Sequence, residues 1–111
     1  KSIAYYDGKI GAPEELMVPF NDRVHFFGDG CYDATVGANG KVYLLQDHLD
    51  RFFTSAKALD INIPMSKAEL GRLLTDLLAA DLNALGETLA YLSARTALTI
   101  DYTTAAVALL G

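Results

Sequence analysis

Two pairs of short segments rich in β-branched and aromatic residues stand out in the first half of the chain. Asp7-Gly8 separates the first pair and Asn39-Gly40 separates the second. Both dipeptides suit a type I′ turn, because that turn needs positive φ at both central residues. The pattern therefore predicts two β-hairpins: Ile3 to Tyr6 with a return strand from Lys9, and Cys31 to Val36 with Val42 to Leu45.

The apolar spacing then changes to that of an amphipathic helix, which we expect over Gln46 to Asp60. Asp47 near its start suits the positive end of the helix dipole. The positions expected to form its buried stripe are Leu49, Phe52, Phe53, Ala56 and Leu59.

A second helix is predicted after the extended segment Ile61 to Pro64. Ser66 and Glu69 have the spacing of a capping box, with Ser at the N-cap and Glu three residues later. We expect this helix to end near residues 83 to 86. Its apolar positions are Leu70, Leu73, Leu74, Leu77 and Leu78.

The rest of the chain is predicted to return to the sheet. Glu87 to Ala94 has strand character. The last stretch, residues 96–111, allows strand through its Thr, Ile, Tyr and Val or helix through its Ala and Leu. Together the elements predict an α+β fold in which two helices pack on one face of an antiparallel sheet. With 111 residues, we expect one domain over 1–111.

Charge and cysteine content narrow the function classes. The formal net charge is −5 and the pI is about 4.7, which argues against nucleic acid and against an anionic membrane surface. Cys31 is the single cysteine, so no internal disulfide can form. The chain start lacks the order of a signal peptide and no apolar run could span a bilayer, so we expect a cytoplasmic protein.

The segment FFGDGCYD, residues 26–33, contains the first candidate chemistry. Gly28-Asp29-Gly30 lacks the length and the Lys-Ser/Thr ending of a phosphate-binding loop, which favours a tight turn or a close backbone approach. Cys31 could be a nucleophile, but a small buried apolar residue is the favoured interpretation. One cysteine and two distant histidines do not make a metal motif, so no metal is assigned.

Arg51 and Tyr32 are the other candidates. Arg51 flanks the apolar stripe of the first helix and could bind phosphate with its guanidinium, or could instead pair with Asp47 at the surface. Tyr32 could bind a substrate or simply fill the core. The acids Asp29, Asp33, Asp47 and Asp50 show no pairing that indicates acid–base chemistry, so solvated side chains are the default expectation.

Six motifs follow one another in a fixed order along the chain: YYDG (5–8), NDR (21–23), FGDGCYD (27–33), NG (39–40), DHLDRFF (47–53) and INIP (61–64). Taken as an ordered set, they resemble the N-terminal domain of fold-type IV enzymes that use pyridoxal 5′-phosphate (PLP). The resemblance covers residues 1 to about 94 and is strongest to D-amino acid aminotransferases. Branched-chain aminotransferases and aminodeoxychorismate lyases share the domain.

The resemblance implies roles for three residues. Arg51 matches the arginine that binds the cofactor phosphate, and Tyr32 matches a tyrosine that faces cofactor and substrate. Tyr91 falls where an aromatic residue borders the substrate pocket. The complete enzyme would transfer an amino group between a D-amino acid and a 2-oxo acid, and would usually be a homodimer.

The resemblance also implies parts that this sequence lacks. The PLP-binding lysine of the family lies in a larger C-terminal domain, and none of the five lysines here matches it. From Arg95 onward the pattern departs from the family, so residues 95–111 carry no expectation from it. We therefore expect the 111-residue chain to be inactive by itself. An aminodeoxychorismate lyase-like domain and a non-catalytic, self-associating or partner-binding domain remain the alternatives.

Overall fold

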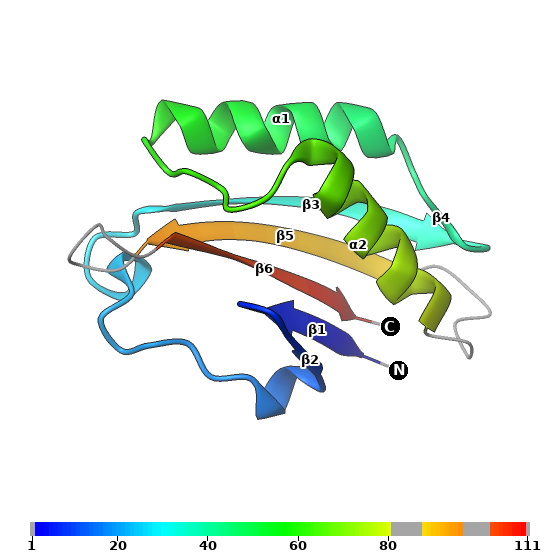
Figure 1. Ribbon diagram of the computed structural model, residues 1–111, viewed down its shortest axis with the longest axis horizontal. Helices are drawn as coiled ribbons and strands as arrows, with labels where there is room; N and C mark the ends of the chain where they lie inside the picture. The colour runs from blue at the N-terminus through cyan, green and yellow to red at the C-terminus, as the bar shows by residue number, and fades with distance from the viewer. Residues whose placement is uncertain (1, 81–87, 97–102, 111) are drawn as a thin grey trace.

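The described chain forms one antiparallel sheet of six strands, with two helices beside it (Figure 1). The computed structural model describes residues 2–80, 88–96 and 103–110. The sheet order is β2-β1-β6-β5-β3-β4. The strands are β1 (Ile3–Tyr6), β2 (Lys9–Gly11), β3 (Gly30–Ala38), β4 (Lys41–Val42), β5 (Thr88–Thr96) and β6 (Thr103–Leu110).

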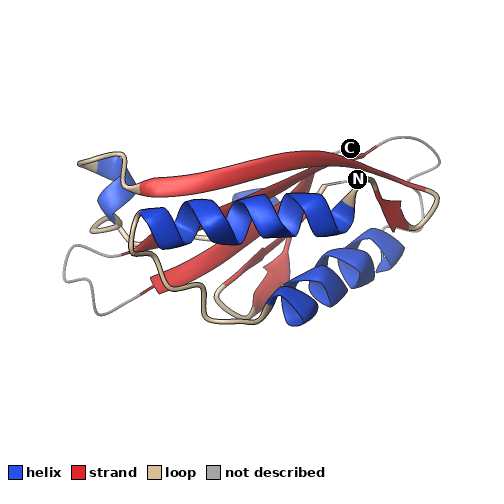
Figure 2. Ribbon diagram, turned by 90° about the horizontal axis from the view of Figure 1, so that it is seen from above, coloured by secondary structure: helices blue, strands red, loops and turns tan. Residues whose placement is uncertain are grey.

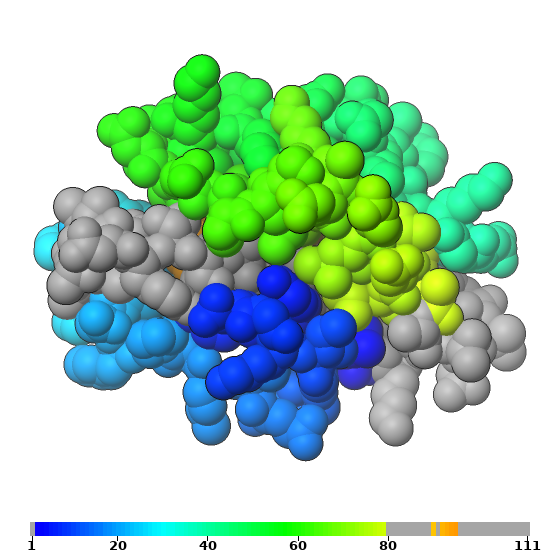
Figure 3. All heavy atoms as spheres, in the orientation of Figure 1, coloured from blue at the N-terminus to red at the C-terminus, as the bar shows by residue number. Residues whose placement is uncertain are grey.

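The helices α1 (Leu45–Ala58) and α2 (Lys67–Ala80) cover one face of this sheet. Seen from above in Figure 2, both helices lie in front of the strands, with α1 running alongside β3. Figure 3 shows the two helices, in green, directly above the N-terminal hairpin, in blue. The predicted fold class, an antiparallel sheet with two helices on one face, is confirmed.

Strand alternation decides which side chains face the helices. On β3 the residues Asp33, Thr35 and Gly37 are buried, whereas the residues between them are less buried. The same face continues onto β5 through the pairs Asp33–Leu92 and Thr35–Ala90. The apolar core under the helices consists of Leu49, Phe52, Ala56, Ile61, Ile63, Leu70, Leu74, Leu77, Leu78, Ala90, Leu92 and Ala94.

Both predicted hairpin turns are confirmed. Asp7 and Gly8 have φ of 50° and 86°, and Asn39 and Gly40 have φ of 53° and 75°. The second return strand is shorter than expected, because β4 ends at Val42 and the helix begins at Leu45. Leu44, expected in the strand, instead adopts a left-handed conformation with φ 49° at the N-cap of α1.

The helical predictions are confirmed in most details. Leu49, Phe52 and Ala56 are buried, but Leu59 is 51% exposed, because α1 ends before it and the chain turns. The capping box of α2 is present: Ser66 Oγ accepts from the Glu69 N–H at 3.1 Å, and Glu69 Oε1 accepts from the Ser66 N–H at 3.0 Å. The expected end of α2 at residues 83–86 lies outside the described residues.

Two further findings complete the fold. The last stretch, for which strand and helix were both open, contains strand β6. Within the described residues, no helix is long and apolar enough to cross a membrane.

Candidate functional site

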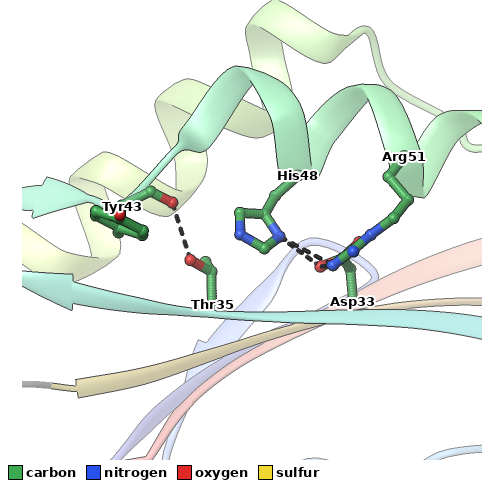
Figure 4. A network of polar contacts seen from close by, with 5 residues as sticks. All are labelled: Asp33, Thr35, Tyr43, His48 and Arg51. Atoms are coloured by element: carbon green, nitrogen blue, oxygen red, sulfur yellow. Dashed lines mark hydrogen bonds and ion pairs between the residues drawn. The ribbon is translucent and has the colours of Figure 1, made fainter.

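Arg51 projects from the second turn of α1 toward strand β3 and binds Asp33 with two nitrogens (Figure 4). Its Nε donates to Asp33 Oδ2 at 2.7 Å, and its Nη2 donates to Asp33 Oδ1 at 2.8 Å. The Arg51 side chain is 66% exposed, whereas the Asp33 side chain is 3% exposed. An exposed guanidinium is thus anchored to a buried carboxylate by a planar, bidentate contact.

His48 contacts the same carboxylate. Its Nδ1 lies 2.7 Å from Asp33 Oδ1. Because an ionised carboxylate only accepts hydrogen bonds, Nδ1 must carry the proton and donate it. Arg51 Nη2, 3.3 Å from the same Nδ1, then meets another donor, so these two nitrogens are not hydrogen-bonded to each other. His48 and Arg51 are three residues apart on a helix and therefore share the face that meets β3.

These contacts determine the charge state of the cluster. Hydrogen bonding from Arg51, with a further contribution from His48, lowers the pKa of Asp33, although burial acts in the opposite direction. The same pairing raises the pKa of Arg51. Asp33 is therefore an ionised carboxylate at neutral pH, and its charge offsets that of Arg51.

The cluster corrects two expectations from the sequence. The partner of Arg51 is Asp33 on the sheet, and not Asp47 on the same helix. Asp33 itself, expected to be solvated, is buried. The missed signal was the alternation of side chains along β3. Asp33 lies among the β3 residues that face α1, opposite the helix face that carries His48 and Arg51.

Within the part of the chain that the structure describes, the hydrogen bonds of Arg51 leave part of its guanidinium available for a ligand. A guanidinium has five N–H donors arranged as forks along its edges. Asp33 occupies the edge formed by Nε and Nη2. The outer N–H of Nη2 and the adjacent N–H of Nη1 form a second edge. This geometry suits bidentate binding of one phosphate or carboxylate.

Tyr32 lies on the other side of the sheet. It directly precedes Asp33 on β3, so its side chain points to the opposite face, where it is 75% exposed. The core-filling alternative for Tyr32 is therefore wrong. The main chain of Tyr91 pairs with that of Ala34, but the Tyr91 side chain lies outside the described residues. The structure thus does not bring Tyr32 and Arg51 into one cluster.

The glycines before Tyr32 serve the turn and a close approach. Gly28 has φ 71°, which glycine adopts without strain. A Cβ at Gly30 would lie 3.3 Å from the Ala94 carbonyl oxygen and 3.4 Å from the Val24 side chain. Between the glycines, Asp29 accepts from Arg23 Nε at 2.8 Å. The interpretation of this segment as a tight turn with a close backbone approach is confirmed.

Cys31 follows these glycines and is partly buried against the core. Burial raises the pKa of its thiol, which opposes activation as a nucleophile. The interpretation as a small apolar residue is supported. Within the described residues, no three His, Cys, Asp or Glu side chains gather to hold a metal ion.

A second ion pair, which sequence reasoning missed, connects the segment before β3 to the sheet. Arg95 Nε on β5 lies 2.8 Å from Asp22 Oδ2, and both side chains are largely buried. Asp22 Oδ1 also accepts from the Val24 N–H at 3.0 Å. Arg95 lies opposite Gly30, on the same face of the sheet as Tyr32. The pair therefore fixes the chain segment that precedes Tyr32 against the sheet.

Comparison with known proteins identifies the family. The model for amino-transferase class IV matches residues 30–108. This chain belongs to that family. The match includes Asp33, His48 and Arg51, and it continues beyond residue 94, where the resemblance in the sequence faded.

Relatives in this family are partly similar in sequence. A D-alanine aminotransferase of Listeria monocytogenes is 42% identical over 66 residues, which is 60% of this chain and 23% of the relative. A D-alanine aminotransferase of Staphylococcus aureus is 37% identical over 76 residues, 66% of this chain and 27% of the relative. The chain therefore spans about a quarter of the length of the curated relatives that it matches.

Solved structures share the fold. The branched-chain amino acid aminotransferase of Escherichia coli superposes with a TM-score of 0.83 at 15% identity, over 99% of this chain and 40% of that one. A hypothetical aminotransferase from Mycobacterium tuberculosis in its PLP-bound form superposes with a TM-score of 0.81 at 21% identity, over 98% of this chain and 39% of that one. The architecture is thus that of fold-type IV aminotransferases.

Proposed function

We propose that residues 1–111 form the small N-terminal domain of a PLP-dependent aminotransferase and that Arg51 binds the cofactor phosphate. The observation that carries the proposal is an exposed guanidinium whose inner edge is fixed by Asp33 and whose outer edge has no partner among the described residues. A phosphate bound there would meet a cation that is already oriented. The single sheet, in which β6 lies between β1 and β5, supports treating 1–111 as one domain.

The residues of this chain suit the end of PLP that carries the phosphate group. When bound, PLP acts as an electron sink for the carbon that loses or gains the amino group. Arg51 would supply the phosphate contact, and Tyr32 and Tyr91 would border the substrate. None of the lysines at positions 1, 9, 41, 57 and 67 matches the family's catalytic lysine, so this domain by itself should not transaminate.

For the substrate, we propose a D-amino acid with a 2-oxo acid as its partner. The support is the identity to D-alanine aminotransferases from two genera. A branched-chain amino acid is the second candidate. It is favoured by the likeness to a putative branched-chain-amino-acid aminotransferase of Methanocaldococcus jannaschii, 35% identical over 66 residues.

A homodimer in the cytoplasm completes the proposal. Several large apolar side chains are exposed in the isolated chain, which suits a surface covered by another chain or domain: Ile10, Met17, Phe20, Phe26, Phe27, Tyr32, Tyr43, Leu44 and Leu59. The cytoplasm is supported by the single cysteine, since no internal disulfide can form.

A graft into a complete relative tests the proposed function. The 66 matched residues of the Listeria monocytogenes enzyme would be replaced by those of this chain. We expect the graft to bind PLP and to transaminate D-alanine faster than L-leucine. Arg51→Ala in the graft should weaken PLP affinity about a hundredfold, because hydrogen bonds between charged groups are lost.

Other outcomes of the graft would contradict specific parts of the proposal. Unchanged PLP affinity in Arg51→Ala would remove the phosphate role of Arg51. Preference for L-leucine would favour the branched-chain alternative. Lys57→Ala, which removes another exposed cation from the last turn of α1, is the matched control and should leave PLP affinity unchanged. Turnover of D-alanine with 2-oxoglutarate by the pure 111-residue chain would overturn the claim that it is inactive alone.

A further inference from the structure

An exposed arginine is a poor anchor unless something restricts it. Its side chain has many rotamers, and ordering them carries an entropic cost. The Arg51 side chain is 66% exposed, so packing contributes little to its order. The two hydrogen bonds to Asp33, at 2.7 and 2.8 Å, fix both the position and the plane of the guanidinium.

Asp33 is itself rigidly held. Its main chain lies within β3, paired with Leu92 of β5, and its side chain is buried. His48 Nδ1 binds Oδ1 from the same helix that carries Arg51 (Figure 4). The carboxylate therefore cannot follow Arg51 if the arginine moves, and it acts as a fixed reference point on the sheet.

We propose that Asp33 is a positioning residue for anion binding by Arg51: it occupies the inner edge of the guanidinium and so presents the outer edge to a phosphate monoester. The inference rests on the proposed function of Arg51. His48 supports Asp33 by donating a third hydrogen bond to the carboxylate, in addition to the two from Arg51. Neither Asp33 nor His48 needs to touch the bound anion.

The charge of Asp33 and its positioning role predict opposite effects. A negative charge beside an anion site repels the anion, so removing it by Asp33→Asn should strengthen binding if charge alone matters. Positioning predicts the reverse, because Asn keeps one acceptor oxygen but replaces the other with a donor that faces Arg51. The guanidinium then loses one of its two anchors, and its outer edge is no longer fixed. The sign of the change therefore decides between the two explanations.

The experiment is a titration of the 111-residue chain with pyridoxine 5′-phosphate, followed by NMR at the Nε–H of Arg51. This probe has no aldehyde and cannot react with lysines, and pyridoxine without phosphate is the ligand control. We expect Asp33→Asn to bind the probe about tenfold more weakly than the unaltered chain. Equal or tighter binding would overturn the proposal.

A matched control separates positioning from general damage to β3. Thr35 is the next residue on the same buried face, and its Oγ1 donates to the Tyr43 carbonyl at 2.9 Å without contacting Arg51. Thr35→Val should remove that bond and leave probe affinity unchanged. A loss in Thr35→Val equal to that in Asp33→Asn would mean that any disturbance of β3 has the same effect, and would overturn the proposal.

Arg51→Lys provides a second test if Asp33→Asn does not fold. Lysine keeps the charge, but its ammonium group is not a planar fork and cannot offer one edge to Asp33 and another to the probe. We expect about tenfold weaker binding in this exposed variant, and unchanged affinity would contradict positioning.

Failure of the proposed function has a different signature. If the probe produces no shift at Arg51 in the unaltered chain, Arg51 is not a phosphate anchor. Anion positioning then fails with it, and the remaining claim, that Asp33 fixes the guanidinium plane, is tested by the Nε–H exchange rate in the absence of probe. Slow exchange in the unaltered chain and fast exchange in Asp33→Asn would support it, and equal rates would refute it.

Discussion

Asp33 is the residue at which strand, helix and proposed ligand site meet. It is a buried carboxylate that accepts from Arg51 and His48, two side chains on one face of α1. A buried charge is stable only when such partners replace its lost hydration. In addition to the apolar core, part of the free energy that holds α1 against β3 therefore depends on the ionisation of Asp33.

The pH dependence of stability should reveal this ionisation. The pKa of Asp33 is lower in the folded chain than in the unfolded one, so its contribution is present above the unfolded pKa, about 3.9, and is lost as pH falls through the folded value. We expect Asp33→Asn to lower the free energy of unfolding by about 2 kcal/mol at pH 7. Urea unfolding of both chains from pH 7 downward should show a constant difference above about pH 5 that starts to shrink as the pH falls below the unfolded pKa of about 3.9. A difference that stayed constant below this pKa would contradict the argument.

The sequence revealed only one side of this contact. Helical spacing placed Arg51 beside the apolar stripe, where phosphate binding and a surface pair with Asp47 were both open, and the resemblance to fold-type IV enzymes implied the phosphate role. Asp33 was not recognised, because its partners lie 15 and 18 residues away, on another element. Such pairs form through packing of a helix on a strand, and local spacing rules contain no information about it.

Among the elements, the two helix starts show which features local rules capture. The start of α2 was predicted because its capping box involves residues only three positions apart. The start of α1 was predicted to within one residue, but Leu44 was wrongly placed in the preceding strand, because it adopts a left-handed conformation that leucine disfavours by about 1–2 kcal/mol. Tertiary structure imposes it: the adjacent Tyr43 carbonyl accepts from Thr35 on β3, which fixes the chain as it leaves the sheet.

The capping box of α2 should contribute measurably to stability. Ser66→Ala removes the acceptor for the Glu69 N–H, and we expect a loss of about 1 kcal/mol in the free energy of unfolding. Thr54→Ala, at an exposed position within α1, is the matched control. It should be neutral or slightly stabilising, because alanine has the higher helix propensity. Urea unfolding measures both, and equal losses would contradict a specific capping effect.

At the scale of the whole molecule, the last strand joins two parts of the sheet. β6 lies between β1 and β5, so the hairpin of β1 and β2 reaches the rest of the sheet only through β6 within the described residues. The fold class could be predicted because it follows from the types of element. The strand order could not, because pairing between the chain's first and last strands leaves no local pattern in either one.

Breaking β6 should therefore release the N-terminal hairpin. The main chain of Val107 pairs with Tyr5 on one side and with Leu92 on the other. Val107→Pro removes an N–H from this central strand and introduces a ring that the ladder cannot accommodate. Hydrogen exchange should then show loss of protection at Tyr5 and Tyr6 before any loss in α1. Val107→Ala keeps the N–H and should retain protection there. If the proline variant also kept it, the hairpin would have to be held by its packing against the core, where Ile3 and Tyr5 contribute, and not by the ladder through β6.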